Sequence, residues 1–171
     1  AVSKPILENL SQKTGETAHI AIREGNNAIF INKVESIHAF RMISFIGWQA
    51  PLYCTAVGKV LLAYGDESVV DNLELEPFTP NTITDQKKLK AELEQIRQRG
   101  WGEDNEEAQP GLQCYAAPIR DYKGEVIAAI SISGPVARLE GVNNVIQLVT
   151  EAARELSQKL GYLGNTDVDK T

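Results

Sequence analysis

The amino-acid sequence predicts an α+β fold in which helices flank a central, mostly antiparallel sheet. Two observations carry this prediction. Residues 17–35 read as two strands joined by a hairpin turn, and residues 100–135 read as three short strands joined by a loop and another hairpin turn. Segments with helical spacing of apolar residues stand before, between and after these strands. With 171 residues, the chain is long enough for one domain that buries a substantial core.

The first half of the chain opens with a helix and continues with strands. Pro5 suits the first turn of a helix, and Gly15 suits its C-terminal cap. Strand-like segments rich in β-branched and aromatic residues follow at residues 17–24, 27–35 and 40–46. We expect these three segments to join the sheet.

Helical patterns dominate the second half. Leu89, Leu93 and Ile96 recur at helical spacing, charged residues fill the opposite face, and a glycine follows at position 100. The sequence therefore predicts a helix over residues 85–100. Further helices are expected at residues 55–65, 67–75 and 139–160.

The strands near residue 130 have one face of small and polar side chains. Because side chains alternate along a strand, Ala129, Ser131 and Ser133 share a face, and apolar residues occupy the other. In the preceding strand Cys114 shares a face with the residues two positions away, Leu112 and Ala116. Small residues leave space and hydroxyls orient a ligand, so these faces are candidates for a pocket floor.

Two further segments can contribute to such a pocket. The helix that begins near Thr55 has free backbone N–H groups at Ala56 and Val57, and its dipole favours an anion there. Gly58 allows another segment to approach closely. The acidic run before the strands places Asp104 near their ends, where it could accept from a ligand hydroxyl, or share a proton if its pKa is raised.

Charge and composition exclude several classes of protein. Seventeen basic and 23 acidic residues give a net charge of −6, and no basic cluster is present to neutralise phosphates, so the chain is not expected to bind DNA by itself. No apolar run approaches the ~20 residues of a membrane span, and no signal peptide is recognisable; a cytoplasmic protein without membrane partners is expected. Cys54 and Cys114 provide no disulfide framework; two buried, reduced thiols are favoured over a single bridge.

Three segments together resemble the effector-binding half of the IclR family of bacterial transcriptional regulators: residues 51–63, the opening from Pro5, and residues 100–135. The resemblance extends from about Pro5 to about Gly161. It implies a GAF-like effector-binding domain over residues 1–163, with a disordered tail at 164–171. It also implies that the family's N-terminal winged helix-turn-helix domain, through which operator DNA would be bound, is absent from this chain, and that the protein forms homodimers or homotetramers.

The resemblance also implies a ligand and its contacts. The family's pockets bind small organic acids, and a sugar-derived, keto or aromatic acid is expected here. Small side chains at Ala39 and Ala50 could widen the cavity, and Trp48 could stack on the ligand or cover the entrance. Backbone N–H groups and serine hydroxyls can hold a carboxylate without a buried cation. The matching positions are Ala56 and Val57 (backbone), Asp104, Cys114, Ser131 and Ser133, with Met42, Ala50 and Leu112 as apolar wall.

Two alternatives stay open at this point. A thiol-dependent enzyme could use Cys114 with Cys54 as resolving partner, although no basic residue adjoins Cys114 to lower its pKa. A dimerisation module with a vestigial pocket is the other. The chain is predicted not to be an enzyme, and no catalytic residue, metal site or cofactor is expected, since His19 and His38 are too few and too isolated. Lys59 belongs to no phosphate loop and is expected to be solvated or paired.

Overall fold

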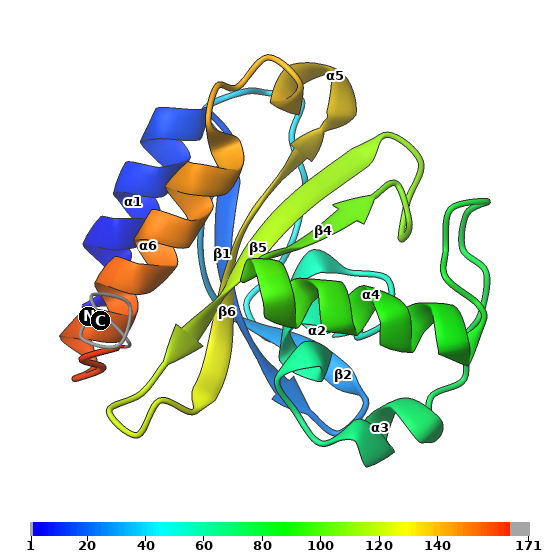
Figure 1. The fold of residues 1–171 in the computed structure, drawn as a ribbon. Helices are drawn as coiled ribbons and strands as arrows, with labels where there is room; N and C mark the ends of the chain where they lie inside the picture. The colour runs from blue at the N-terminus through cyan, green and yellow to red at the C-terminus, as the bar shows by residue number, and fades with distance from the viewer. Residues whose placement is uncertain (1, 165–171) are drawn as a thin grey trace.

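The computed structural model describes residues 2–164 and contains an antiparallel sheet of six strands between two layers of helices (Figure 1). The strands lie in the order β3-β2-β1-β6-β5-β4, so each half of the sheet is built from strands that are neighbours in sequence. The α+β prediction with a central antiparallel sheet is confirmed. The strands are β1 (Thr17–Glu24), β2 (Asn27–Val34), β3 (Gln49–Pro51), β4 (Gly102–Asn105), β5 (Leu112–Arg120) and β6 (Val126–Pro135).

One face of the sheet is covered by α1 (Ser3–Thr14) and α6 (Val145–Lys159), which lie side by side in Figure 1. The isoleucine face of β6, with Ile130 and Ile132, packs against the apolar sides of these two helices. Ile130 and Ile132 are fully buried, so the face of β6 that the sequence predicts to be wholly apolar does form a core.

The other face is covered by α2 (Ala56–Ala63), and α4 (Gln86–Arg99) packs on α2; α3 (Glu67–Asp71) lies beyond the end of α2 (Figure 1). Here Ala129 of β6 and Ala116 of β5 pack under α2. Because these side chains are small, the helix approaches the sheet closely. The one-turn helix α5 (Val136–Leu139) follows β6 directly.

Local sequence signals fix the helix ends. Gly15 and Gly100 adopt left-handed backbone conformations with φ of 75° and 85°, and their N–H groups donate to the carbonyls of Ser11 and Ile96. At the other ends, the side chains of Thr55, Asp66 and Asp85 cap α2, α3 and α4 by accepting from first-turn N–H groups.

Three element predictions are wrong. Residues 40–46 form no strand; the third strand is β3 at Gln49–Pro51, which pairs with β2 at Asn27–Ile29. The helix predicted over residues 139–160 begins only at Val145, because a one-turn helix and a turn precede it. The helix predicted to end at residue 75 ends at Asp71. The apolar side chains of residues 40–46 favour a strand, but in the structure these side chains do not pack in the sheet.

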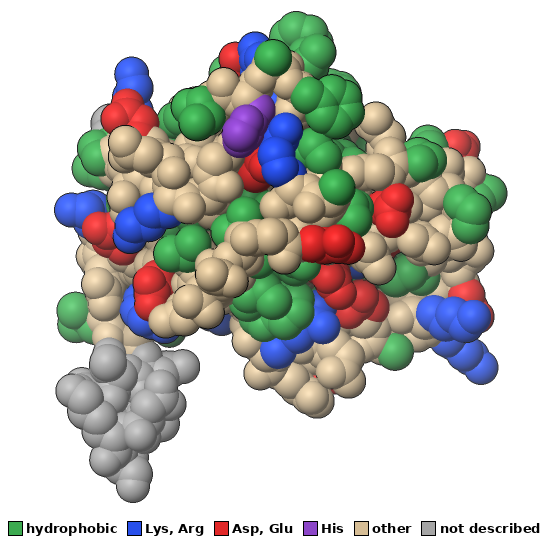
Figure 2. Space-filling model, turned by 90° about the horizontal axis from the view of Figure 1, so that it is seen from above, with side chains coloured by type: hydrophobic (Ala, Val, Ile, Leu, Met, Phe, Trp, Pro, Cys, Tyr) green, Lys and Arg blue, Asp and Glu red, His purple; other side chains and the backbone are tan. Residues whose placement is uncertain are grey.

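The segment over residues 36–46 instead forms an irregular loop beside the sheet. Ile37, Phe40 and Ile43 are 86%, 77% and 69% exposed, and Phe45 and Ile46 are also exposed. Figure 2 views the molecule from the side on which this loop lies in Figure 1, and hydrophobic side chains gather there beside a histidine. The loop is held at two buried points. The Ser36 N–H donates to Thr17 Oγ1 and its hydroxyl donates to the Gly15 carbonyl. Ser44 hydrogen-bonds His19, and Lys33 donates to the Ser44 carbonyl.

No helix within residues 2–164 is long and apolar enough to cross a membrane. Of the predicted tail, Gly164 is part of a turn, and residues 165–171 lie outside the described residues.

Candidate effector site at the start of α2

A cavity of about 190 Å³ lies between the first turn of α2, the small-residue face of β5 and β6, and the loop before β3. The structure brings to its wall all nine residues for which the sequence predicts ligand contact. Their function as ligand contacts remains a prediction. These residues are Met42, Ala50, Ala56, Val57, Asp104, Leu112, Cys114, Ser131 and Ser133. Ala39, by contrast, is not part of the wall.

The N-terminus of α2 is fixed by Thr55. Its hydroxyl donates to the Pro51 carbonyl at 2.7 Å and accepts from the Gly58 N–H at 3.1 Å. The Lys59 N–H donates to the Thr55 carbonyl. Ala56 and Val57 therefore remain as the first-turn donors beside the cavity, where the positive end of the helix dipole also acts.

Gly58 is required by close packing at this turn. A β-carbon built there would lie 2.3 Å from the Leu52 carbonyl oxygen and 2.5 Å from Thr55 Oγ1. No side chain fits at such distances, so the expected close approach at Gly58 is confirmed. The capping hydroxyl and the glycine together hold the donor pair in place.

Ser131, Ser133 and Cys114 form the floor. In the ladder between β5 and β6, Cys114 is directly opposite Ser133, and Ala116 is opposite Ser131. Both serines are almost fully buried, at 2% and 3% exposure. Both serines line the cavity together with Ala56 and Val57 of α2, so a carboxylate in the cavity could accept hydrogen bonds from both elements.

Asp104 is fully buried on β4 and has one unused oxygen. Its Oδ1 accepts from the Glu107 N–H at 2.7 Å, and its Oδ2 has no hydrogen-bond partner among the described residues. Burial raises the pKa of this carboxyl to about 7, a rise that the Glu107 N–H bond and the Lys59 charge only partly oppose. The carboxyl is therefore poised to hold or release a proton near neutral pH.

The two cysteines lack the features of a reactive thiol. Both are free and buried. Burial, reinforced by the charge of Asp104, raises the pKa of Cys54 to about 12 and that of Cys114 well above its ordinary value. A thiolate is the reactive form, so the environment works against thiol chemistry.

A buried ion-pair cluster stands behind Asp104. Lys59 is fully buried, and its Nζ lies 2.7 Å and 3.0 Å from the two carboxylate oxygens of Glu107 and 3.6 Å from Glu92. Of the two states expected for Lys59, paired is right and solvated is wrong. Glu107 also accepts from the Asn105 N–H, so the cluster holds the end of β4 against α2 and α4.

Two aromatic residues complete the wall: Phe30, which sequence reasoning did not assign, and Trp48. Phe30 stacks on His19 with ring centroids 4.5 Å apart and contacts the edge of Trp48. Trp48 is 42% exposed and lines the cavity, which fits either of the roles considered for it. Burial lowers the pKa of His19 to about 4, so this histidine is a neutral core residue. The other unassigned wall residues are Gln49, Pro51, Thr55, Ala108 and Gln109.

Fold and site together define an effector-binding domain of bacterial transcriptional regulators. Residues 1–158 match the family model described as the bacterial transcriptional regulator IclR C-terminal domain. The chain belongs to this family.

The relatives are transcriptional regulators rather than enzymes. The chain is 40% identical over 162 residues to the HTH-type transcriptional regulator KdgR of Escherichia coli, covering 91% of this chain and 62% of the relative. It is 40% identical over 167 residues to the repressor AllR of the same species, covering 94% and 62%. The crystal structure of the C-terminal domain of E. coli KdgR superposes with a TM-score of 0.83 at 37% identity, covering 94% of this chain and 96% of that one. The chain thus spans less than two thirds of either curated relative.

Proposed function

We propose that this domain senses a small organic acid in the cavity at the start of α2, and that the bound acid controls operator binding by the DNA-binding part of the whole protein. We expect the ligand to be a keto acid, a compact sugar-derived acid or an aromatic acid. A carboxylate would accept from the N–H groups of Ala56 and Val57 and from the hydroxyls of Ser131 and Ser133.

The single observation that carries this proposal is that helix-end donors and two serines line one cavity, to which the described residues contribute no cationic side chain. A carboxylate needs donors, and backbone donors at a helix end bind anions without a buried charge. The cavity volume of about 190 Å³ favours a compact ligand over an extended one. Met42, Leu112 and Trp48 would contact its apolar part.

Control of DNA binding requires that the acid bind one arrangement of the whole protein better than another. The loop over residues 36–46 offers a route for this, since it supplies Met42 to the cavity wall and carries exposed apolar side chains. In the whole protein we expect a homodimer or homotetramer, whose paired DNA-binding domains would respond together.

A thermal-shift screen against keto, sugar and aromatic acids tests the ligand class. Ligand that binds only the folded state raises the melting temperature by mass action. One class of acid is expected to give a dose-dependent rise. The absence of a rise with every class would contradict the proposal and favour a dimerisation module.

The double variant Ser131→Ala/Ser133→Ala tests the site. We expect it to bind the acid about 1–3 kcal/mol more weakly, because hydrogen bonds to a charged group are lost. Titration calorimetry measures the change. Ser157→Ala is the matched control: this serine is equally buried but lies on α6 away from the cavity, so its loss should leave the affinity unchanged. Equal affinities in the double variant and the original chain would refute the floor assignment.

Acid binding should weaken as the pH rises through 7. Because burial raises the pKa of Asp104 to about 7, the protonated carboxyl, which can donate from Oδ2 to a ligand carboxylate, is present below that pH and lost above it. We expect the affinity for the acid to fall about tenfold between pH 6 and pH 8. Titration calorimetry at both values measures it.

Asp104→Asn is the control for this prediction. Its amide donates at every pH, and its carbonyl can still accept from the Glu107 N–H. The affinity of this variant should change less than about twofold over the same range. If the affinity of Asp104→Asn for the acid depended on pH in the same way as that of the original chain, the titrating group would not be Asp104.

A further inference from the structure

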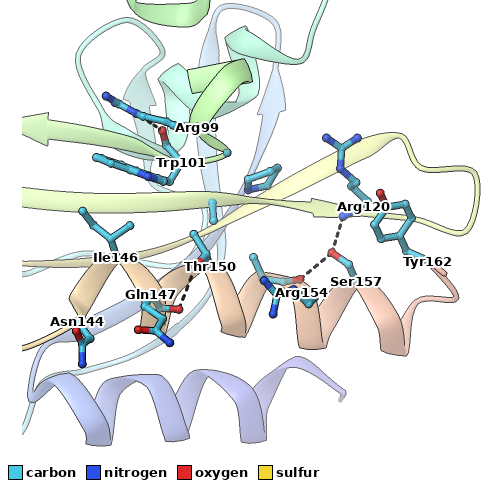
Figure 3. A pocket seen from close by; sticks show the side chains of 14 residues that line it. Arg99, Trp101, Arg120, Asn144, Ile146, Gln147, Thr150, Arg154, Ser157 and Tyr162 are labelled. Carbon is cyan, nitrogen blue, oxygen red and sulfur yellow. Dashed lines mark hydrogen bonds between the residues drawn. The ribbon is translucent and has the colours of Figure 1, made fainter. Parts of the chain in front are cut away.

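A second and larger hollow, of about 700 Å³, lies between β5 and α6 (Figure 3). It shares no lining residue with the effector cavity. We call it the β5–α6 groove; its walls are the side chains around Trp101 on one side and α6 from Asn144 to Ser157 on the other, with Ala117 and Pro118 between them.

The groove exists because β4 is short. The β4 strand pairs with β5 only at Gln113–Ala116, so residues 117–120 of β5 have no strand beside them on that side. This edge is a poor template for another strand. Pro118 has no N–H, and the Arg120 N–H donates to Ser157 Oγ at 2.9 Å. Any occupant must therefore be recognised by side chains.

The groove is positively charged, although the chain as a whole is negatively charged. Arg99, Arg120 and Arg154 line it, whereas no Asp or Glu is among the lining residues that the structure describes. The whole chain, by contrast, carries a net charge of −6. The acidic residues Glu151 and Glu155 of α6 lie instead along the hollow that faces α1.

Two of the three arginines are held in place by aromatic rings. Arg99 stacks over the Trp101 ring at 3.9 Å and donates to the Trp101 carbonyl, with a weaker contact of 3.4 Å to Glu92. Arg120 lies 5.0 Å from the Tyr64 ring and 5.8 Å from the Tyr162 ring. Such stacking orients the guanidinium donors in advance, which lowers the entropic cost of binding an anion.

The third arginine is free. Arg154 is exposed on α6 and has no ion pair within residues 2–164. Figure 3 shows Arg154 beside Ser157, with Arg120 and Tyr162 at the same end of the groove, whereas Arg99 and Trp101 lie on the opposite wall. Positive charge is thus placed at two separate positions.

The shape favours an extended occupant. From Asn144 to Ser157 the helix wall is about 20 Å long, the length of about six residues of extended chain. The hollow is an open trough, whereas small-molecule sites enclose most of their ligand. The amides of Asn144 and Gln147 and the side chain of Ile146 line the end away from Arg154 (Figure 3). We propose that the β5–α6 groove binds an extended acidic peptide segment of a partner protein.

The two tryptophans of the chain allow a direct test, because Trp48 lines the effector cavity and Trp101 lines the groove. In the Trp48→Phe variant, Trp101 fluorescence reports on the groove alone. Titration with hexaglutamate at low salt should change this fluorescence saturably, and hexalysine should not. The change should weaken as salt rises, because the contacts are between charges.

Arg154→Glu in this background should weaken hexaglutamate binding tenfold or more. Arg23→Glu is the matched control; this exposed arginine lies at the hairpin of β1 and β2, and its reversal changes the net charge equally. Its effect should be less than twofold. Equal weakening by both variants, or no saturable signal, would overturn the proposal. So would tighter binding of a single-stranded oligonucleotide, or citrate or inorganic phosphate binding as tightly as the peptide. Failure of the acid screen would leave these results unaffected.

Discussion

The Lys59→Met variant is expected to lose about 3–5 kcal/mol of the free energy of unfolding. Lys59 is fully buried, and its removal leaves the Glu107 carboxylate almost fully buried without its counter-charge at 2.7 Å. Coulomb attraction and desolvation nearly cancel in an intact buried pair, but only the desolvation cost remains when one partner is lost. Urea unfolding followed by circular dichroism measures the loss.

The double variant Lys59→Met/Glu107→Gln distinguishes this cause from lost packing. Its glutamine is neutral and can still accept from the Asn105 N–H, so we expect it to recover much of the lost stability. Lys90→Met is the surface control, since its pair with Asp71 is open to solvent, and its unfolding midpoint should hardly move. A double variant no more stable than Lys59→Met would contradict the ion-pair explanation.

Gly58→Ala is expected to lower the free energy of unfolding by about 3 kcal/mol or more and to abolish measurable binding of the acid. The added β-carbon would lie 2.3 Å from a backbone carbonyl, and backbone cannot move aside as a flexible side chain can. The first turn of α2 would be displaced, and the Thr55 cap with it. Denaturant unfolding and calorimetry measure the two effects.

Gly141→Ala serves as the matched control, because a β-carbon there would make only an ordinary contact of 3.5 Å with the Arg138 carbonyl. It should retain both stability and affinity. A Gly58→Ala protein with normal affinity would show that the position of the α2 donors does not matter for binding, and would remove the helix end from the site.

Local patterns predicted the glycine-capped helix ends and the faces of the strands, but not the start of α6 or the end of α3. Gly15 and Gly100 end helices because glycine adopts the left-handed backbone conformation easily, and this depends on neighbours in sequence alone. The alternation in β6 likewise assigns Ile132 to one core and Ser133 to the cavity face. Such inferences succeed because the deciding interaction lies within a few residues.

Apolar composition misled where tertiary contacts decide. Residues 40–46 have the composition of a strand, yet β3 pairs with the edge of β2. The loop is held instead by buried hydrogen bonds of Ser36 and Ser44. No local pattern shows which of two nearby segments pairs with the edge of the sheet. The resemblance to a known family, rather than periodicity, brought Met42 of this loop into the predicted site.

The sequence by itself determined the fold class, the family and the nine residues around the cavity. Strand alternation, helix ends and family motifs are all local patterns that can be identified in the sequence. Only the tertiary structure decided the burial of Lys59, the raised pKa of Asp104 and the charge of the β5–α6 groove. These properties arise from desolvation and from charges brought together by distant segments. Lys59 and Glu107, for example, are 48 residues apart in sequence and 2.7 Å apart in space.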